Sequence, residues 1–219
     1  MVFRRAGKTS PPPDPATDRD ERLIFAAARG DLDSFNELVR IHERSVLNLC
    51  WRMLGTLPAA EDASQDTFIK AWTNAKSFKE GAVRPWLLRI ATNTCYDTLR
   101  SRNRKPANSL DALEFETEPA WSSQSASVDP VRFAETGDLS RMLEAALARI
   151  PDEQRLAITL CDIQGLSLAE AAEVMQISLG TVKSRLFRGR AKLRDLLVAS
   201  PAGRELLLSG ERSTSREIE

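Results

Sequence analysis

The sequence predicts an all-α protein with two helical domains joined by a flexible acidic linker. Apolar residues recur at three- and four-residue steps in two long stretches, and no segment alternates with the period of two that strands show. Residues 106–130 separate these stretches with prolines, a serine-rich run and acidic residues but no basic one. We expect a disordered arm at 1–19, domains at 20–105 and 139–199, a linker at 106–138 and a tail at 200–219.

The composition excludes several classes of protein. The 31 basic residues equal the 31 acidic ones, so binding to a polyanion must come from local segregation of charge. The longest apolar run, Leu23–Ala28, is far shorter than the roughly 20 residues of a membrane helix. Prolines rather than an apolar stretch follow Arg4 and Arg5, so no signal peptide is readable. We expect a cytoplasmic chain without membrane insertion.

The inventory of reactive side chains disfavours an enzyme. His42 is the single histidine, which excludes a zinc cluster built on His and Cys, and we expect it on a helix face. Cys50, Cys95 and Cys161 lie far apart in helical patterns, which predicts reduced, buried thiols. No phosphate-binding glycine motif is present. We therefore expect no catalytic residue, metal, cofactor or small-molecule substrate.

The first domain should contain three or four helices. One helix is predicted from Asp33, as its N-cap, to Gly55, because a glycine commonly ends a helix. Pro58 should open a second helix that runs toward Trp72. A third helix, Trp86–Arg100, has an apolar stripe formed by Leu87, Ile90, Ala91, Thr94, Cys95 and Thr98.

The second domain should end in a helix-turn-helix. Helical periodicity begins near Leu139 and is interrupted at Pro151. Ser167 is then a predicted N-cap for a short helix that ends at Met175. A turn over residues 176–178 and a last helix over residues 179–197 complete the outline.

The last helix has the strongest chemical signal. At 100° per residue, one line of side chains should face the domain core: Val182, Leu186, Gly189 and Leu193. Another line should face outward: Ser184, Phe187, Arg188 and Ala191. Six basic residues and no acidic one lie between Leu179 and Arg194, which suits the phosphates and bases of a DNA major groove. A solvated cationic face at a helix C-terminus is the alternative, but it leaves Phe187 exposed without benefit.

Two other clusters allow both a structural and a functional interpretation. Basic residues from Arg84 to Lys105 alternate with Phe78, Trp86 and Tyr96, a combination that suits single-stranded DNA, although Trp86 alone is more often a core residue. The acidic run Glu61–Asp66 could complement a helix dipole or dock a basic partner helix.

Taken together, these segments resemble bacterial sigma factors of the sigma-70 family, in its extracytoplasmic-function group. Residues 61–72 are similar to region 2.2, residues 86–94 to regions 2.3 and 2.4, and residues 165–186 to region 4.2. The resemblance covers about 22–105 and 139–197 in the family's order. It implies a sigma-2 helical bundle and a sigma-4 helix-turn-helix.

The resemblance also implies partners and sites. The partners would be bacterial core RNA polymerase, through its β′ clamp helices, promoter DNA and an anti-sigma factor. The loop Lys79–Pro85 would help to hold a flipped −10 base, and the linker would thread toward the RNA exit channel. The implied core-polymerase residues are Glu61, Asp62, Gln65 and Asp66. The −10 residues are Arg84, Arg89, Asn93 and Arg100, and the −35 residues are Lys183, Ser184, Arg185, Phe187, Arg188, Arg190 and Lys192.

The chain departs from the family's pattern at a few positions. The loop before Trp86 is one residue short, with Val83 in place of an aromatic residue and Pro85 in place of Thr. Gln176 stands where a glycine is common, and a left-handed conformation there would cost about 1 kcal/mol. The alternative function is a helix-turn-helix regulator that binds duplex operators as a dimer without polymerase. A carboxylate-based hydrolase would instead require a divalent metal.

Overall fold

The computed structural model describes residues 15–79, 81–104 and 137–199, and every regular element in these ranges is helical. The first group of helices comprises α1 (Pro15–Ala27), α2 (Leu32–Leu54), α3 (Leu57–Asn74), the 3₁₀ turn η1 (Ala75–Ser77) and α4 (Val83–Arg104). The second comprises α6 (Gly137–Ala148), α7 (Asp152–Ile158), the π-helical segment η2 (Thr159–Ile163), α8 (Leu168–Met175) and α9 (Leu179–Val198). The predicted all-α class and its two helical domains are confirmed. The predicted arm up to residue 14, most of the linker and the tail lie outside the described residues.

Helix α2 shows how local signals set the helix ends. Its N-cap is Asp31 rather than the predicted Asp33, because the Asp31 carboxylate accepts hydrogen bonds from the amides of Asp33 and Ser34. Its C-cap is Gly55, as predicted, with φ at 78° in the left-handed region.

Two helices begin earlier in the sequence than predicted. Helix α1 begins at Pro15, so residues 15–19 belong to the first bundle and not to a disordered arm. Helix α4 begins at Val83, three residues before the predicted start, and includes Pro85 in its first turn, where a proline is tolerated. Val83 is buried, which fixes this turn against the bundle. Residues 83–85 are therefore helical, although we expected them in a loop.

The helix-turn-helix forms as the sequence predicts. Ser167 caps α8 in a reciprocal capping box with Glu170, and Gln176 adopts the left-handed conformation with φ at 55°. Ser178 caps α9. A Cβ atom on Gly189 would lie only 3.0 Å from the Ile158 side chain, so the absence of a side chain allows α9 to approach α7 closely.

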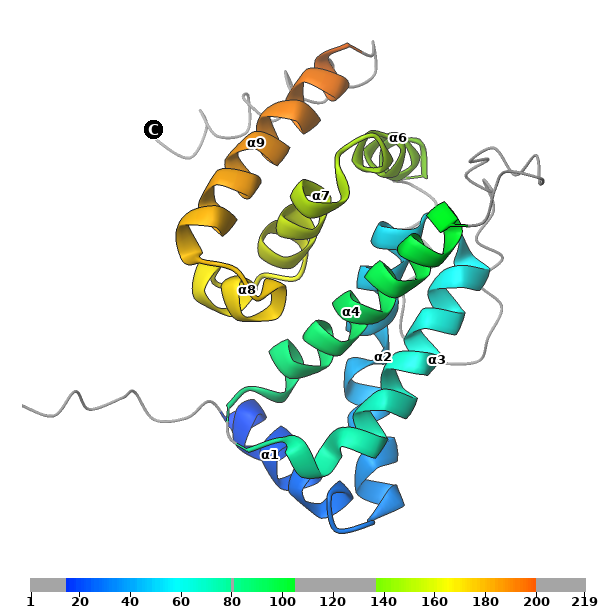
Figure 1. The fold of residues 1–219 in the computed structure, drawn as a ribbon, viewed down its shortest axis with the longest axis vertical. Coiled ribbons are helices and arrows are strands. Elements are labelled where there is room, and N and C mark those ends of the chain that lie inside the picture. The colour runs from blue at the N-terminus through cyan, green and yellow to red at the C-terminus, as the bar shows by residue number, and fades with distance from the viewer. Residues whose placement is uncertain (1–14, 80, 105–136, 200–219) are drawn as a thin grey trace, which may run out of the picture.

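The two groups of helices pack against each other. Figure 1 shows α4 along their boundary, with the first bundle on one side and α7 and α8 on the other. Helix α8 contacts α4, and buried residues of both domains, among them Leu88 and Leu160, belong to one continuous apolar cluster. The domains therefore share part of their core.

The interior contains thiol groups and one buried imidazole. Cys50 and Cys95 are buried and reduced, whereas Cys161 is half-buried. His42 lies on the buried face of α2, and its Nε2 lies 2.7 Å from the Asp20 carboxylate of α1. The imidazole therefore ties α1 to α2.

Membrane-spanning and metal-binding features are absent from the described ranges. No helix there is both long and apolar enough to cross a bilayer. Nor do those ranges contain a cluster of three or more His, Cys, Asp or Glu residues suited to a metal ion.

Candidate nucleic-acid and protein interfaces

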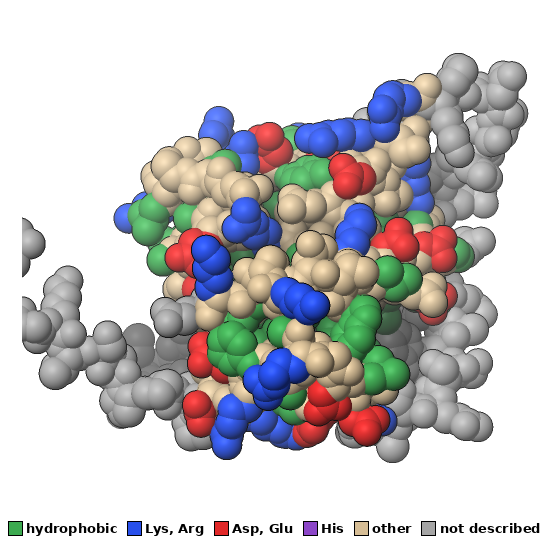
Figure 2. Space-filling model, turned by 60° about the horizontal axis from the view of Figure 1, so that its bottom comes forward, with side chains coloured by type: hydrophobic (Ala, Val, Ile, Leu, Met, Phe, Trp, Pro, Cys, Tyr) green, Lys and Arg blue, Asp and Glu red, His purple; other side chains and the backbone are tan. Residues whose placement is uncertain are grey.

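Charges of both signs are distributed over the surface, so individual helix faces must be considered separately. Figure 2 shows one face of the molecule on which Lys and Arg side chains lie interspersed with acidic and hydrophobic ones. A partner that recognises charge must therefore read a particular helix face.

Of the four residues predicted to face outward on α9, Ser184, Phe187 and Arg188 are exposed, whereas Ala191 is half-buried. Val182, Leu186 and Gly189 are buried on the inner side. On the outer side Ser184 and Arg188 are exposed, and the Phe187 side chain is 76% exposed. An aromatic side chain held this far out of the core is available for contact with a partner.

Only part of the positive charge on α9 is free of carboxylates. The Arg185 guanidinium lies 2.7 Å from Glu153 of α7 and is largely buried. Arg190 forms a two-pronged pair with Asp162 of η2, one contact of which is 2.9 Å long, and this hydrogen bonding raises the pKa of Arg190. These two arginines, both predicted to bind the −35 element, hold α9 against its own domain.

Other cations of α9 remain available. Within the described residues, Lys183, Arg188 and Lys192 are exposed and form no ion pair. Arg188 donates to the Ser184 carbonyl at 3.2 Å, which orients its guanidinium along the helix without neutralising it. Helix α9 therefore has fewer exposed, unpaired basic residues than the sequence alone suggested.

Helix α4 carries a second polar face. Arg89, Asn93 and Arg100 are exposed on it, spaced so that they lie along one side of the helix. Arg100 lies 3.8 Å from Asp97, and both side chains are mostly solvated, so this pair is weak.

Arg84 is not part of this outer face. Its guanidinium donates to the Gln164 carbonyl and side-chain oxygen, both at 2.7 Å, and to the Ser45 hydroxyl at 3.3 Å. Of the predicted −10 residues, the structure groups the other three and turns Arg84 toward the second domain.

The aromatic residues near α4 are structural in this conformation. Phe78 is buried, and its ring packs edge-on against Trp86 at 5.5 Å and against Phe25 at 5.8 Å. Tyr96 is half-buried, and burial raises its pKa, with a further contribution from Glu153 of the second domain. Phe78 is buried and Trp86 and Tyr96 are half-buried, so no ring of these three is fully exposed.

An acidic stripe follows one side of α3. Glu61, Asp62, Gln65 and Asp66 are exposed, and in the described residues none of these carboxylates forms an ion pair. The first turn of α3 contains no acidic residue, so the dipole interpretation loses support because that effect is confined to the first turn. Ile69 continues the stripe and is 56% exposed, a residue that the sequence analysis missed.

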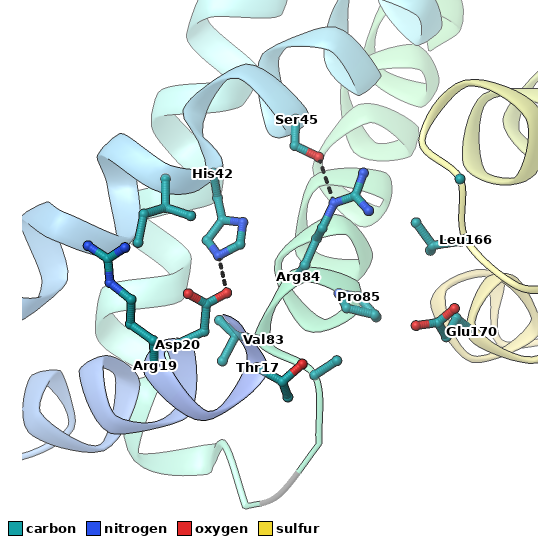
Figure 3. A pocket seen from close by; sticks show the side chains of 13 residues that line it. Thr17, Arg19, Asp20, His42, Ser45, Val83, Arg84, Pro85, Leu166 and Glu170 are labelled. Atoms are coloured by element: carbon teal, nitrogen blue, oxygen red, sulfur yellow. Dashed lines mark hydrogen bonds and ion pairs between the residues drawn. The ribbon is translucent and has the colours of Figure 1, made fainter. Parts of the chain in front are cut away.

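A cleft of about 470 Å³ opens between the two domains. Figure 3 shows the Asp20–His42 pair on one wall, Arg84 beside it, and Leu166 and Glu170 of the second domain on the opposite wall. The cleft marks the end of the seam at which α8 meets the first bundle.

Most of the chain is similar to known transcription proteins. Residues 38–105 match the family described as Sigma-70 region 2, and residues 140–193 match Sigma-70, region 4. The chain is 38% identical over 181 residues to the ECF RNA polymerase sigma factor SigW of Bacillus subtilis, covering 81% of this chain and 96% of the relative. It is 36% identical over 187 residues to the ECF RNA polymerase sigma factor SigE of Mycolicibacterium smegmatis, covering 84% and 70% respectively.

Solved structures give the same result. The sigma factor RpoE of Bartonella quintana, solved with the anti-sigma factor NepR, superposes with a TM-score of 0.61 at 28% identity, covering 76% of this chain and 98% of that one. CnrH, solved with the cytosolic domain of CnrY, gives a TM-score of 0.59 at 28% identity, with 84% and 99% coverage.

Proposed function

The chain belongs to the sigma-70 family as an RNA polymerase sigma factor of the extracytoplasmic-function group, and we propose how its surfaces divide the work of transcription initiation. Core RNA polymerase binds the acidic stripe of α3, the outer face of α4 melts and holds the −10 element, and α9 reads the −35 duplex. The factor directs polymerase in the cytoplasm and catalyses no reaction itself. An anti-sigma factor is a further partner, because the neighbours RpoE and CnrH were solved with NepR and CnrY.

The observation that supports this division best is the outer face of α9. Phe187 is exposed in the centre of the helix between Lys183 and Arg188, and the inner side is buried in the domain. A helix-turn-helix places the N-terminal residues of such a helix in the major groove. The cations can contact phosphates or guanine, and Phe187 can contact a thymine methyl group.

The proposed roles are divided between the two helical domains. We propose that residues 20–105 with the preceding turn of α1 form the polymerase-binding and −10-binding unit, and residues 139–199 the −35-binding unit. The acidic segment 106–138 connects them and enters the RNA exit channel of polymerase.

Run-off transcription tests the function. Purified chain, core RNA polymerase and genomic DNA fragments should give discrete transcripts that core polymerase alone does not give. A regulator should instead bind its operator as a symmetric dimer without polymerase. Transcripts absent from every fragment, together with tight binding of the isolated chain to a palindrome, would favour that alternative.

A pre-melted template tests the role of α4. Asn93→Ala should reduce open-complex formation on duplex promoters, and a template already unpaired at the −10 element should partly restore it, since unpairing costs a few kcal/mol. Asn36→Ala, an exposed asparagine of α2, is the matched control and should have no effect. A defect of Asn93→Ala that the pre-melted template does not relieve would assign Asn93 a structural role.

A further inference from the structure

Two carboxylates from outside the helix-turn-helix contact arginines of α9. Glu153 of α7 lies 2.7 Å from the Arg185 guanidinium, and Asp162 of η2 binds Arg190 through both of its oxygens. Arg185 and Arg190 are five residues apart, which places them about 140° apart around the helix. The buried side of α9, which includes Gly189, lies between them. The two pairs therefore hold the flanks of α9.

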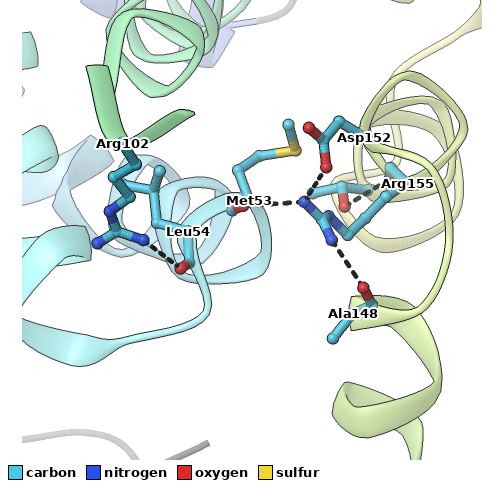
Figure 4. A network of polar contacts seen from close by, with 7 residues as sticks. Met53, Leu54, Arg102, Ala148, Asp152 and Arg155 are labelled. Carbon is cyan, nitrogen blue, oxygen red and sulfur yellow. Dashed lines mark hydrogen bonds and ion pairs between the residues drawn. The ribbon is translucent and has the colours of Figure 1, made fainter. Parts of the chain in front are cut away.

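Helix α7 is itself firmly held, so that it can position Glu153. Arg155 donates to the Met53 carbonyl at 3.0 Å and to the Ala148 carbonyl at 3.2 Å, and it also binds Asp152 (Figure 4). Asp152 is thus paired within α7, whereas the neighbouring Glu153 pairs with α9.

Asp162 lies in a wide helical turn. In η2 the Gln164 amide donates to the Thr159 carbonyl, five residues earlier, at 2.8 Å, and such π-helical turns are frequent at functional sites. The Asp162 oxygens accept from both the Nε and the terminal NH2 group of Arg190. An arginine also binds phosphate in this two-pronged way. Asp162 and a DNA phosphate therefore compete for the same donors.

Stability alone does not account well for the pair on the exposed flank. The Arg190 side chain is 59% exposed and the Asp162 side chain 30%, and solvated ion pairs contribute little to folding. An effect on DNA binding is a better explanation for a carboxylate that occupies an arginine of the recognition helix.

Phosphate contacts carry no sequence information, and specificity is a difference between two affinities. On an unrelated sequence the protein can take whichever position suits the phosphates, so an unpaired arginine gains a contact everywhere. At a matched site base contacts fix α9, which limits what a further arginine can reach. Withholding arginines should therefore weaken binding to unrelated DNA more than binding to the matched site.

We propose that Asp162 and Glu153 are specificity-determining residues, which withhold Arg190 and Arg185 from DNA phosphates and so limit binding to unrelated sequences. Lys183, exposed and without an ion pair among the described residues, remains available for the duplex. The restraint of Arg190 is a property of the second domain alone, whereas its effect on promoter choice rests on the proposed function.

Fluorescence anisotropy with the full chain and two duplexes of equal length tests the proposal. One duplex has random sequence, and the other carries the −35 segment of a promoter found by run-off transcription. Asp162→Asn should tighten binding to the random duplex about two- to fivefold and raise its salt dependence by about one unit. The matched duplex should gain less, so the ratio of the two affinities falls. Glu153→Gln should act in the same direction but less strongly, because Arg185 is largely buried.

Two variants are matched controls. Asp195→Asn removes the same charge from α9 itself, but Asp195 lies 3.7 Å from Arg194, and both side chains are mostly solvated, so little restraint is lost. Asp162→Glu keeps the charge that binds Arg190. Both should leave the two affinities nearly unchanged.

The outcomes are distinct. A gain on the random duplex no larger in Asp162→Asn than in Asp195→Asn would overturn the proposal. So would equal weakening on both duplexes together with a lower melting temperature, since the Asp162 pair would then be structural. If the unaltered chain binds both duplexes equally and gives no transcripts, the proposed function fails. The gain on the random duplex alone then decides whether Asp162 restrains Arg190.

Discussion

The acidic stripe of α3 and the basic face of α9 are both exposed helix faces of one charge sign, but they differ in how their charges are paired. The α3 stripe has no ion pair among the described residues. On α9, Arg185 and Arg190 are paired with carboxylates of their own domain, whereas Lys183, Arg188 and Lys192 are not. The difference separates charges that position a helix from charges that are left for a partner.

This distinction predicts unequal effects of substitutions that look equivalent in the sequence. A charge already neutralised within the domain adds little to an intermolecular contact. An unpaired charge gains an oppositely charged partner across the interface when the complex forms.

The largest effect should come from the acidic stripe. Asp66→Lys places a positive charge against the basic partner helix and should weaken association with core polymerase by several kcal/mol, because like charges at an interface are costly. The melting temperature should change little, since Asp66 is exposed and lies beyond the first turn of α3. A pull-down with core polymerase and thermal unfolding of the same variant measure the two quantities.

Glu43→Lys is the control for net charge, because Glu43 is exposed on a different helix, α2. A destabilised Asp66→Lys protein that still binds core polymerase normally would contradict the docking assignment.

The next effect concerns base recognition. Arg188→Ala should weaken binding to the −35 duplex by about 1–3 kcal/mol and reduce the discrimination between correct and altered sequences. Fluorescence anisotropy with matched and mismatched duplexes measures both, and Arg40→Ala, an exposed arginine of α2, is the control. A loss that is equal for all sequences would restrict Arg188 to phosphate contact.

Much of the fold follows from local sequence signals. Gly55 at the end of α2, the Ser167 capping box and the inner line of α9 could all be predicted because each depends on residues within one or two helical turns. The N-cap of α2 was misplaced because Asp31 and Asp33 give the same signal two residues apart, and only backbone geometry distinguishes them.

The pairing of charges could not be predicted in this way. Arg84 meets Gln164 across 80 positions of sequence, and His42 meets Asp20 on another helix. Such contacts depend on how helices pack, which composition and periodicity do not specify. Arg84, Arg185 and Arg190 are for this reason engaged within the protein itself, which the sequence did not indicate, whereas the four predicted residues of the acidic stripe are all exposed. The assignment of both sets to partners stays a prediction.

The buried pair of His42 and Asp20 tests the second half of this comparison, which is that paired charges stabilise the fold. Burial lowers the pKa of His42, and the Arg84 charge adds to this effect although Asp20 opposes it. Below pH about 6.5 the unfolded state therefore binds a proton more readily than the folded state, so the free energy of unfolding falls as the pH falls. The contribution is at most about 1.4 kcal/mol per pH unit.

His42→Gln should remove this part of the pH dependence and leave −35 duplex binding at neutral pH unchanged. Urea unfolding between pH 5 and about 7.5 measures the slope in both proteins. An identical slope in the variant would show that His42 titrates alike in the folded and unfolded states.

The smallest effect gives the most direct comparison, since it concerns two cations on one helix. Lys192 is exposed and unpaired, so Lys192→Ala should weaken binding to all duplexes alike and reduce the salt dependence by about one unit, as expected for one lost phosphate contact. Arg190 is already paired with Asp162, so Arg190→Ala should change the salt dependence much less and cost about 0–1 kcal/mol of stability. Duplex affinity measured over a series of salt concentrations, with thermal unfolding of both variants, separates these outcomes. Equal reductions in salt dependence would mean that the Arg190–Asp162 pair breaks when DNA binds, and pairing within the free protein would then no longer indicate which charges a partner can use.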